Sequence, residues 1–328
     1  MYDKDKKYPE YKGGFIMVVE LKEIVKRYGD LVALDHFSLS VREGEIYGLL
    51  GPNGSGKTTA INSMLSLLRY DSGEVKIFGE AMHPTNYNVK KRIGLVMQNI
   101  GVYDELSVQE NIDYFCGLYI NDRKLRKQYV DEAISFVGLD DFRKFGPKKL
   151  SGGLLRRLNL ACGIAHKPDL IILDEPTVAV DPQSRNRISD GIKSLAEEGK
   201  TIIYTTHYME EVEYLCDRLT IMDRGKEIIT GTSDEIKAMS NHGEVVTLEI
   251  FDLDNDTQHK IQSIKEVAEF EYNPGKAVVK FDKGDSQLLK LLKVLDESQV
   301  NVINLTVQKP SLNDVFLEIT GKELRDNA

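Results

Sequence analysis

Hydrophobic and polar positions follow two different patterns along this 328-residue chain, strict alternation and continuous apolar runs. In "HFSLSVREGE", Phe37, Leu39 and Val41 alternate with polar residues, which predicts a half-buried strand. "SGEVKIFGE" repeats this pattern, whereas "DLIILDEP" and "KTIIYTTH" are continuous apolar runs, typical of strands covered on both faces. A helical stretch over residues 182–198 separates the two apolar runs, which favours parallel crossover units.

The pattern predicts two domains and a short extension. Residues 1–16 are charged and are expected to form a flexible N-terminal extension without the apolar segment of a secretory signal. Residues 17–239 predict a parallel α/β core with an antiparallel β layer and a helical insertion at about 101–167. Residues 240–328 carry four candidate strands and predict a small α+β domain. Its candidate helices span 256–267, 286–299 and 311–321.

Composition restricts the possible partners and the cellular environment. The net charge is −9 with acidic and basic residues interspersed, so no positive field attracts nucleic acid, and no nucleic-acid partner is expected. No apolar run reaches eighteen residues, so no membrane span is expected. Cys116, Cys162 and Cys216 are isolated, which favours reduced thiols in the cytoplasm and gives no metal site.

A glycine-rich loop lies between the apolar run at residues 46–50 and an amphipathic pattern that begins near Thr58. Its glycines permit positive φ and close backbone approach, so several N–H groups can face one phosphate beside a helix N-terminus. The G-x-x-x-x-G-K-[ST] pattern predicts a nucleoside triphosphate site, in which Lys57 reaches the β- and γ-phosphates and Thr58 ligates Mg²⁺. The residues expected to contact the nucleotide here are Gly51, Pro52, Asn53, Gly54, Ser55, Gly56, Lys57, Thr58 and Thr59.

Two acidic residues follow the buried strand "LIILDEP". Open α/β sheets bind ligands at the carboxyl ends of their strands. Asp174 there would hold Mg²⁺, directly or through water, and Glu175 would orient or deprotonate the attacking water. Alone, the pair could equally belong to a solvated loop, but the phosphate loop upstream favours nucleotide hydrolysis.

Five further motifs, together with these two and in order across residues 18 to about 235, resemble an ABC-type ATPase, the nucleotide-binding subunit of an ABC transporter. They are "KRYGD" with Tyr28, "IGLVMQN" with Gln98, "LSGGL" at 150–154, "AVDP" at 179–182 with Asp181, and "IIYTTH" with His207. The resemblance implies a P-loop NTPase fold with a RecA-like core, and ATP and Mg²⁺ as cofactors. It also implies that Glu175, His207 and Lys57 are catalytic.

The resemblance assigns the remaining site residues as well. Tyr28 would stack on adenine, and Gln98 would join Thr58 and Asp174 around Mg²⁺ and connect the γ-phosphate to the helical insertion. Ser151, Gly152 and Gly153 would close over the nucleotide of a second subunit in a head-to-tail dimer, beside Asp181. Leu154 replaces the usual glutamine, and we expect Leu154 and Leu155 to pack against neighbouring helices.

The tail "VQKPSLNDVFLEITGKELRD" resembles ATPases of the daunorubicin-resistance type of ABC exporter. That resemblance implies a separately encoded permease, which would dock around residues 103–119, and a peripheral location on the cytoplasmic side of the cell membrane. A soluble ABC ATPase that acts on ribosomes or DNA remains an alternative, as does an importer ATPase. The C-terminal domain could be regulatory or could mediate dimerisation, and the transported substrate is not encoded in the nucleotide site.

Overall fold

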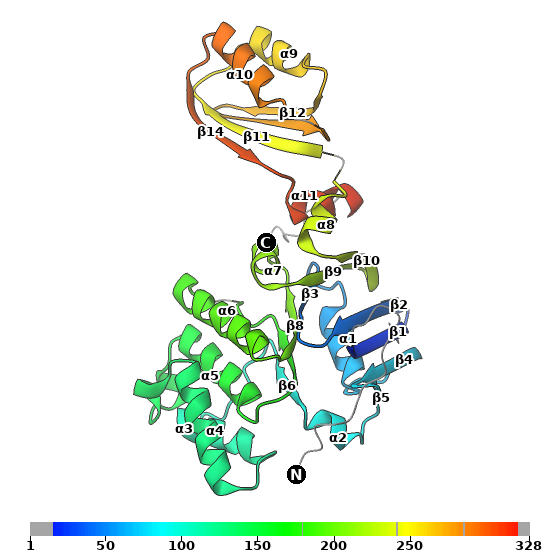
Figure 1. The fold of residues 1–328 in the computed structure, drawn as a ribbon, viewed down its shortest axis with the longest axis vertical. Helices are drawn as coiled ribbons and strands as arrows, with labels where there is room; N and C mark the ends of the chain where they lie inside the picture. The colour runs from blue at the N-terminus through cyan, green and yellow to red at the C-terminus, as the bar shows by residue number, and fades with distance from the viewer. Residues whose placement is uncertain (1–15, 179, 241, 285, 321–328) are drawn as a thin grey trace. The chain divides into compact units, whose positions relative to one another are not determined.

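The computed structural model describes residues 16–178, 180–240, 242–284 and 286–320 (Figure 1). It divides into two compact units, of which the first extends to Ser233 and the second begins at Asp234. This division falls a few residues before the domain boundary expected at 240. Apart from Ile16, the expected N-terminal extension lies outside the described residues.

The first unit is organised around a six-stranded sheet with the order β10-β9-β3-β8-β7-β6. The central strands are buried along their whole length, as their continuous apolar runs predict. Every neighbouring pair is parallel except β9 and β10, which form an antiparallel edge. The strands are β3 (Ile46–Leu50), β6 (Ile93–Val96), β7 (Leu170–Asp174), β8 (Thr201–Thr206), β9 (Arg218–Asp223) and β10 (Lys226–Gly231).

A four-stranded antiparallel sheet with the order β2-β1-β4-β5 forms a second layer. Phe37, Leu39 and Val41 all point into its buried face, which confirms the half-buried strand predicted from their alternation. They share one hydrophobic core with α1 (Lys57–Met64) and with strands of the central sheet. The strands of this layer are β1 (Met17–Tyr28), β2 (Leu31–Arg42), β4 (Ser72–Ile77) and β5 (Glu80–Ala81).

Helices make up the segment that was expected to be a helical insertion. Throughout residues 101–167, all of which are described, the chain forms helices, two short 3₁₀ turns and loops, without a strand. Its helices are α3 (Val108–Gly117), α4 (Arg123–Phe136) and α5 (Gly152–Ile164). The first unit also contains α2 (Tyr87–Lys90), α6 (Pro182–Glu197) and α7 (Met209–Leu215), and α8 (Ser233–Lys237) lies at the division between the units.

The second unit is an α+β unit with the antiparallel strand order β12-β13-β11-β14. Ile261 of α9 and Leu291 of α10 pack in the same core as the buried side chains of the sheet. Its elements are β11 (His242–Ile250), α9 (Asn255–Gln262), β12 (Val267–Asn273), β13 (Lys276–Asp282), α10 (Leu288–Glu297), β14 (Val302–Gln308) and α11 (Leu312–Thr320).

One predicted helix boundary in this unit is wrong. The helix expected over 256–267 ends at Gln262, because Val267 already pairs with Phe281 as the first residue of β12. The helices expected over 286–299 and 311–321 are present as α10 and α11, each slightly shorter, and residue 321 lies outside the described part of the chain.

Candidate functional site

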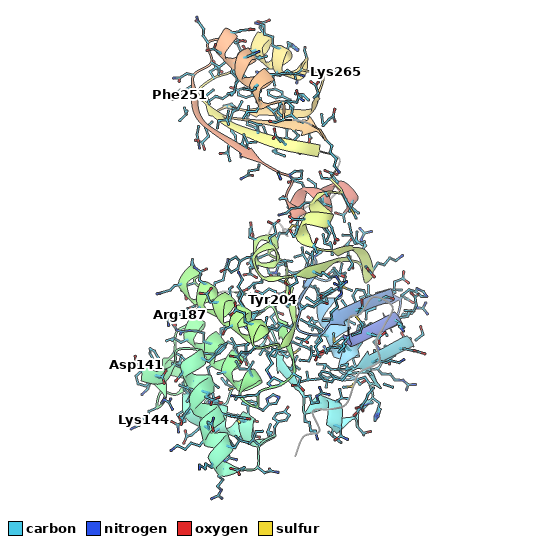
Figure 2. The ribbon with its side chains drawn as sticks, viewed as in Figure 1. Asp141, Lys144, Arg187, Tyr204, Phe251 and Lys265 are labelled. Atoms are coloured by element: carbon cyan, nitrogen blue, oxygen red, sulfur yellow. The ribbon has the colours of Figure 1, made fainter. Side chains whose placement is uncertain are left out.

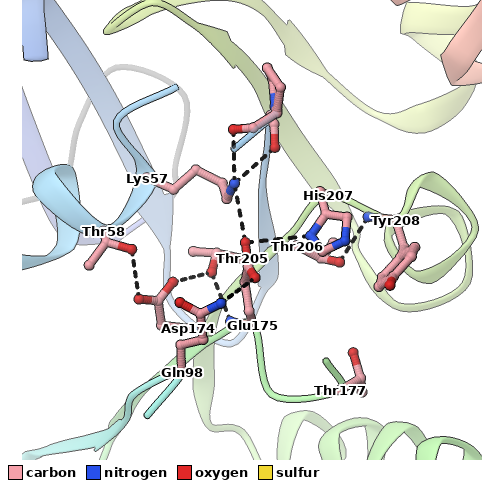
Figure 3. A network of polar contacts seen from close by, with 12 residues as sticks. Lys57, Thr58, Gln98, Asp174, Glu175, Thr177, Thr205, Thr206, His207 and Tyr208 are labelled. Carbon is pink, nitrogen blue, oxygen red and sulfur yellow. Dashed lines mark hydrogen bonds and ion pairs between the residues drawn. The ribbon is translucent and has the colours of Figure 1, made fainter. Parts of the chain in front are cut away.

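The predicted site residues lie at the carboxyl ends of neighbouring parallel strands. The phosphate loop follows β3, Asp174 is the last residue of β7, and His207 directly follows β8. Because β3, β8 and β7 are adjacent and parallel, these ends meet at one edge of the sheet (Figure 3). The register therefore assembles a polar cluster from residues that are far apart in the sequence.

The loop after β3 has a conformation that requires glycine at two positions. Gly56 has a φ of +109°, and a Cβ atom there would lie 2.7 Å from the Ala33 carbonyl oxygen. At Gly51 a Cβ atom would lie 2.4 Å from the Met222 carbonyl oxygen. The Ser55 hydroxyl is buried and has no hydrogen-bond partner among the described residues. Such an unsatisfied group suits a loop whose polar atoms are meant for a ligand.

Lys57 is buried and points back into this loop. Its Nζ atom donates hydrogen bonds to the carbonyl oxygens of Gly51 at 2.8 Å and Pro52 at 3.2 Å. Nζ also lies 3.3 Å from Oε1 of Glu175, with both side chains almost fully buried. The ammonium group is therefore surrounded by oxygen atoms at the place where phosphate oxygens are expected to bind.

Glu175 is the centre of the cluster. Gln98 Nε2 donates a hydrogen bond of 3.0 Å to Oε2, and His207 Nδ1 lies 3.5 Å from Oε1. Glu175 has a φ of +48°, a left-handed conformation that costs a non-glycine residue about 1–2 kcal/mol. Its N–H donates to the carbonyl and hydroxyl oxygens of Thr205, and these bonds hold the strained backbone against β8.

Asp174 forms a separate polar group beside Glu175. It is fully buried, and its two oxygens accept hydrogen bonds from Thr58 Oγ1 at 3.0 Å and Thr205 Oγ1 at 2.6 Å. A carboxylate next to a hydroxyl fits Mg²⁺, which prefers oxygen ligands and keeps several waters. Gln98, expected as a third ligand, contacts Glu175 in the structure instead. Among the described residues, no three His, Cys, Asp or Glu side chains form a metal-binding group.

The other residues expected to contact the nucleotide are Tyr28 and the remaining residues of the loop after β3. Asn53, Gly54 and Thr58 are exposed, whereas Pro52 and Thr59 are half-buried. Tyr28 ends β1 in the antiparallel sheet, and 48% of its surface is exposed. Lys26 Nζ lies 4.9 Å from the centre of its ring, a cation–π contact. The tyrosine ring is thus accessible to a ligand and belongs to a different layer from the Glu175 cluster.

The "LSGGL" motif at residues 150–154, called the signature segment here, leads into α5. Ser151 is the N-cap, and its Oγ atom accepts a hydrogen bond of 3.3 Å from Leu154 N. Ser151 and Gly152 are exposed, but Gly153 is buried. Leu154 and Leu155 are partly buried against a hydrophobic core that α3, α4, α5 and α6 share with strands of the central sheet, which agrees with the packing expected of them.

Gly153 has a packing role that the sequence did not indicate. A Cβ atom there would lie 2.3 Å from Ser184 Oγ and 2.7 Å from Asp181 Oδ2. Asp181 is the N-cap of α6 and accepts a hydrogen bond of 2.9 Å from Ser184 N, which lowers the pKa of the carboxyl. The missing side chain of Gly153 therefore allows α5 and the start of α6 to pack closely together.

Sequence reasoning missed Arg156, which connects α5 to the segment that carries Gln98 and to the segment that follows Glu175. Its Nη1 donates to the Gln98 carbonyl oxygen at 2.5 Å, and Nη2 donates to the Val178 carbonyl oxygen at 3.5 Å. Burial lowers the pKa of Arg156, and the negative charge of Glu175 opposes this shift. A buried cation near Glu175 therefore binds the backbone at Gln98 and at Val178.

Asn159, one helical turn further, was missed as well. Its Nδ2 donates to the Met97 carbonyl oxygen at 3.3 Å, and its Oδ1 accepts from Gly101 N at 3.1 Å. Together with Arg156, it fixes the segment that carries Gln98 to the helix that begins with the signature. The available signal was a polar residue inside the apolar run "LNLACGI".

Comparison with known proteins gives these motifs a family. Residues 34–178 match the family model for the ABC transporter, and residues 231–320 match that of the ATP-binding protein DrrA1-3-like, C-terminal domain. The linearmycin resistance ATP-binding protein of Bacillus subtilis is 35% identical over 311 residues, 94% of this chain and 100% of that protein. The chain belongs to the ABC transporter ATP-binding family.

Other members of the family agree with this assignment. The daunorubicin resistance ATP-binding protein DrrA3 of Streptomyces coeruleorubidus is 32% identical over 314 residues, 92% of this chain and 95% of that protein. A bacterial ABC transporter cassette solved as a dimer has a TM-score of 0.61 at 28% identity, and covers 65% of this chain and 98% of its own. The same cassette bound to ADP and phosphate after hydrolysis has a TM-score of 0.60 at 27% identity.

The ABC ATPase is thus an ATP-binding and ATP-hydrolysing protein with a P-loop NTPase core and a DrrA-like C-terminal domain. These likenesses confirm the fold and the enzyme class that the motifs predicted. In the described part of the chain, no helix has the length and apolar character needed to cross a membrane.

Proposed function

We propose that this ABC ATPase drives an ABC exporter by binding ATP-Mg²⁺ in the loop after β3 and hydrolysing it with Glu175 as the base. The observation that carries the proposal is the convergence of Lys57, Gln98 and His207 on the Glu175 carboxylate. These groups come from four separate segments of the chain, and nucleotide hydrolysis needs such a base, cation and γ-phosphate contact within one small volume.

The loop and its neighbours supply the binding contacts. Lys57 and the loop N–H groups bind the β- and γ-phosphates, and the exposed ring of Tyr28 stacks on adenine. Thr58 and Asp174, whose Oγ1 and Oδ2 atoms lie 3.0 Å apart, would hold Mg²⁺, and the Gln98 side chain would join them after releasing its hydrogen bond to Glu175. The metal ion, when bound, neutralises charge on the phosphate oxygens.

Hydrolysis follows from the position of Glu175. Its carboxylate accepts a proton from a water whose oxygen attacks the γ-phosphorus, while the bond from that phosphorus to the β–γ bridging oxygen breaks. ADP and inorganic phosphate leave as products. Lys57 and His207 donate hydrogen bonds to the γ-phosphate oxygens, so catalysis consists mainly of positioning and electrostatic stabilisation.

Two copies form a head-to-tail dimer in this proposal. Ser151, Gly152 and Gly153 at the start of α5 close over the nucleotide bound to the other copy, beside Asp181. The exposure of Ser151 and Gly152 at a helix N-terminus supports this arrangement, as does the likeness to a cassette solved as a dimer. ATP is then part of the interface, and hydrolysis weakens it.

Export is supported by the names of the relatives. They include ATP-binding proteins for linearmycin resistance, daunorubicin resistance and Nod factor export. A separate permease would hold the ATPase on the cytoplasmic face of the membrane. Exposed aromatic residues offer a docking surface: Tyr103 and Tyr114 are in edge-to-face contact at 4.9 Å, and Tyr119 is also exposed.

The substitution Glu175→Gln tests the chemistry. Turnover should fall by roughly 10²–10⁴-fold because the amide cannot accept the proton, while ATP binding stays intact. Light scattering should then find a dimer in ATP and a monomer in ADP. Glu74→Gln, an exposed carboxylate on β4, is the matched control. Turnover near that of the wild type would exclude Glu175 as the base, and a monomer in both nucleotides would exclude the proposed dimer.

The transport role is tested with the tagged protein purified in mild detergent from its native membranes. We expect a stoichiometric membrane-spanning permease among the co-purifying chains. Recovery of the ATPase alone, or with ribosomes or DNA, would overturn the exporter proposal while leaving the hydrolysis mechanism to stand on the Glu175→Gln result.

A further inference from the structure

Another buried carboxylate, besides Asp174 and Glu175, is joined by hydrogen bonds to the segments that carry the Glu175 cluster. Glu211 of α7 is only 7% exposed, and its two oxygens accept three hydroxyl hydrogen bonds. Oε1 accepts from Thr177 Oγ1 at 2.7 Å, and Oε2 accepts from Tyr204 OH at 2.7 Å and Thr206 Oγ1 at 2.9 Å. A carboxylate that accepts several buried hydroxyl bonds is held in one orientation, since each lost bond leaves a polar group unsatisfied.

The three hydroxyl donors lie on segments that carry the proposed catalytic residues. Thr177 follows Glu175 by two residues, and Tyr204 and Thr206 belong to β8, whose end leads directly into His207. Tyr204 is fully buried on this central strand (Figure 2). Burial, and secondarily the charge of Glu211, raises the pKa of Tyr204 well above its ordinary value. Its hydroxyl therefore stays protonated and remains a donor.

Thr206 connects Glu211 to the turn that contains His207. Its hydroxyl donates to Glu211. The same hydroxyl accepts a hydrogen bond of 3.0 Å from Tyr208 N (Figure 3). Both backbone neighbours of His207 are thereby attached to the carboxylate, one directly and one through this hydroxyl. The Nδ1 atom of His207 lies 3.5 Å from Oε1 of Glu175. A different backbone conformation of the turn, which would move the His207 ring, would break the hydrogen bonds of Thr206 to Glu211 and Tyr208 N.

Arg185 extends the network to the start of α6. Its Nε lies 3.5 Å from Oε1 of Glu211, and its guanidinium carbon lies 5.3 Å from the centre of the Tyr208 ring. Arg185 is in the first turn of the helix that Asp181 caps. A displacement of that helix start therefore acts on the same carboxylate that holds the His207 turn.

We propose that Glu211 is a positioning residue for ATP hydrolysis, which orients the His207 turn towards Glu175 and connects it to the Asp181 end of α6. This inference rests on the proposed function, because it assigns Glu211 to the alignment of His207. Glu211 does not touch the reacting atoms, and acts through its hydrogen bonds to Thr206 and Thr177 and its ion pair with Arg185. A carboxylate suits this role because it has acceptor oxygens only, whereas all three of its hydroxyl partners must donate.

A purely structural role would predict a different pattern of mutant effects. Thr206→Val and Tyr204→Phe each remove one buried hydroxyl that donates to the same oxygen of Glu211. Both should lower the melting temperature similarly, because each removes one bond to Oε2 and one further contact. For Tyr204 the further contact is with Thr177 Oγ1 at 3.2 Å, and for Thr206 it is with Tyr208 N. Only the Thr206 change also releases Tyr208 N beside His207. Positioning thus predicts unequal activities at similar stabilities, and a structural role predicts that activity follows stability.

The test compares these two variants in steady-state ATP hydrolysis. Thr206→Val should lower kcat at least tenfold with KM for ATP within twofold, and Tyr204→Phe should lower kcat less than threefold. Thr206→Ser should restore most of the loss, because its hydroxyl can form both bonds. In NMR spectra the His207 ring resonances, assigned with the His207→Ala variant, should shift in Thr206→Val and not in Tyr204→Phe.

The outcomes separate the two proposals. Equal kcat losses in Thr206→Val and Tyr204→Phe, or an unshifted His207 ring, would overturn the positioning role while Glu175→Gln still tests the base. Full turnover in His207→Ala would overturn both the γ-phosphate contact of His207 and the positioning role. Loss of turnover in His207→Ala together with wild-type turnover in Thr206→Val would overturn the positioning role alone.

Discussion

Replacing Arg156 by methionine should release the Gln98 segment from α5. The bond from Nη1 to the Gln98 carbonyl oxygen is short at 2.5 Å and charge-assisted, and such bonds contribute about 1.5–3 kcal/mol. The bond to the Val178 carbonyl oxygen is at the outer distance limit, 3.5 Å, and should add little. Removing a buried guanidinium also removes its desolvation cost, and methionine keeps much of the packing.

The net loss in the free energy of unfolding should therefore be about 1–2 kcal/mol, measured by urea denaturation. Turnover should fall more than stability suggests, because misplacing a positioned group by about 1 Å can cost 10²-fold in rate. Arg123→Met, at an exposed arginine on α4, is the control. The Asn159→Ala change acts on the same segment, so the two losses should be less than additive. Wild-type turnover in Arg156→Met, or fully additive losses, would refute the reasoning.

Two further predictions concern packing and pH. Burial lowers the pKa of His166 to about 4, so the unfolded chain takes up a proton that the folded chain excludes, and stability falls as pH drops below about 6.5. Between pH 7 and 5 the wild type should lose about 2 kcal/mol more than His166→Gln in urea unfolding, and equal pH slopes would contradict this. Gly153→Ala should lower turnover by at least about tenfold, because the new methyl group displaces the start of α6, while the ATP affinity of the single subunit, set by the loop after β3, stays unchanged. Gly146→Ala, where a Cβ atom meets only an ordinary contact, is the control, and full turnover in Gly153→Ala would show that α6 adapts.

The elements with strong local patterns were predictable from the sequence. Continuous apolar runs and a complete phosphate-loop pattern identify β7, β8 and the loop after β3, because burial on both faces and tight turns act on neighbouring residues. The end of α9 was not predictable in this way. Ile261, Ile264 and Val267 continue a helical spacing, and only the pairing of Val267 with Phe281 turns the last of them into a strand residue.

The candidate site shows the same limit. The motif residues could be named, but the hydrogen bond from Arg156 to Gln98 joins positions 58 residues apart, and no local pattern records such a pair. Gly153 was expected to admit a phosphate, and its contact with Ser184 on another helix depends on tertiary packing. Side-chain contacts between different elements can be identified only from the structure, because sequence spacing shows which residues share a face only within one helix or strand.

The contacts of Lys57 impose a selection on its ligands. Any anion that approaches Nζ competes with two carbonyl oxygens and with the carboxylate of Glu175. A small, weakly charged anion replaces too few of these contacts, whereas a triphosphate brings many charged oxygens at once. Under the proposed roles, drawing Lys57 away from Glu175 also leaves the carboxylate free to accept a proton. The ion pair between Lys57 and Glu175 then couples substrate binding to catalysis, because Glu175 becomes available as the base only when a sufficiently charged substrate has bound Lys57.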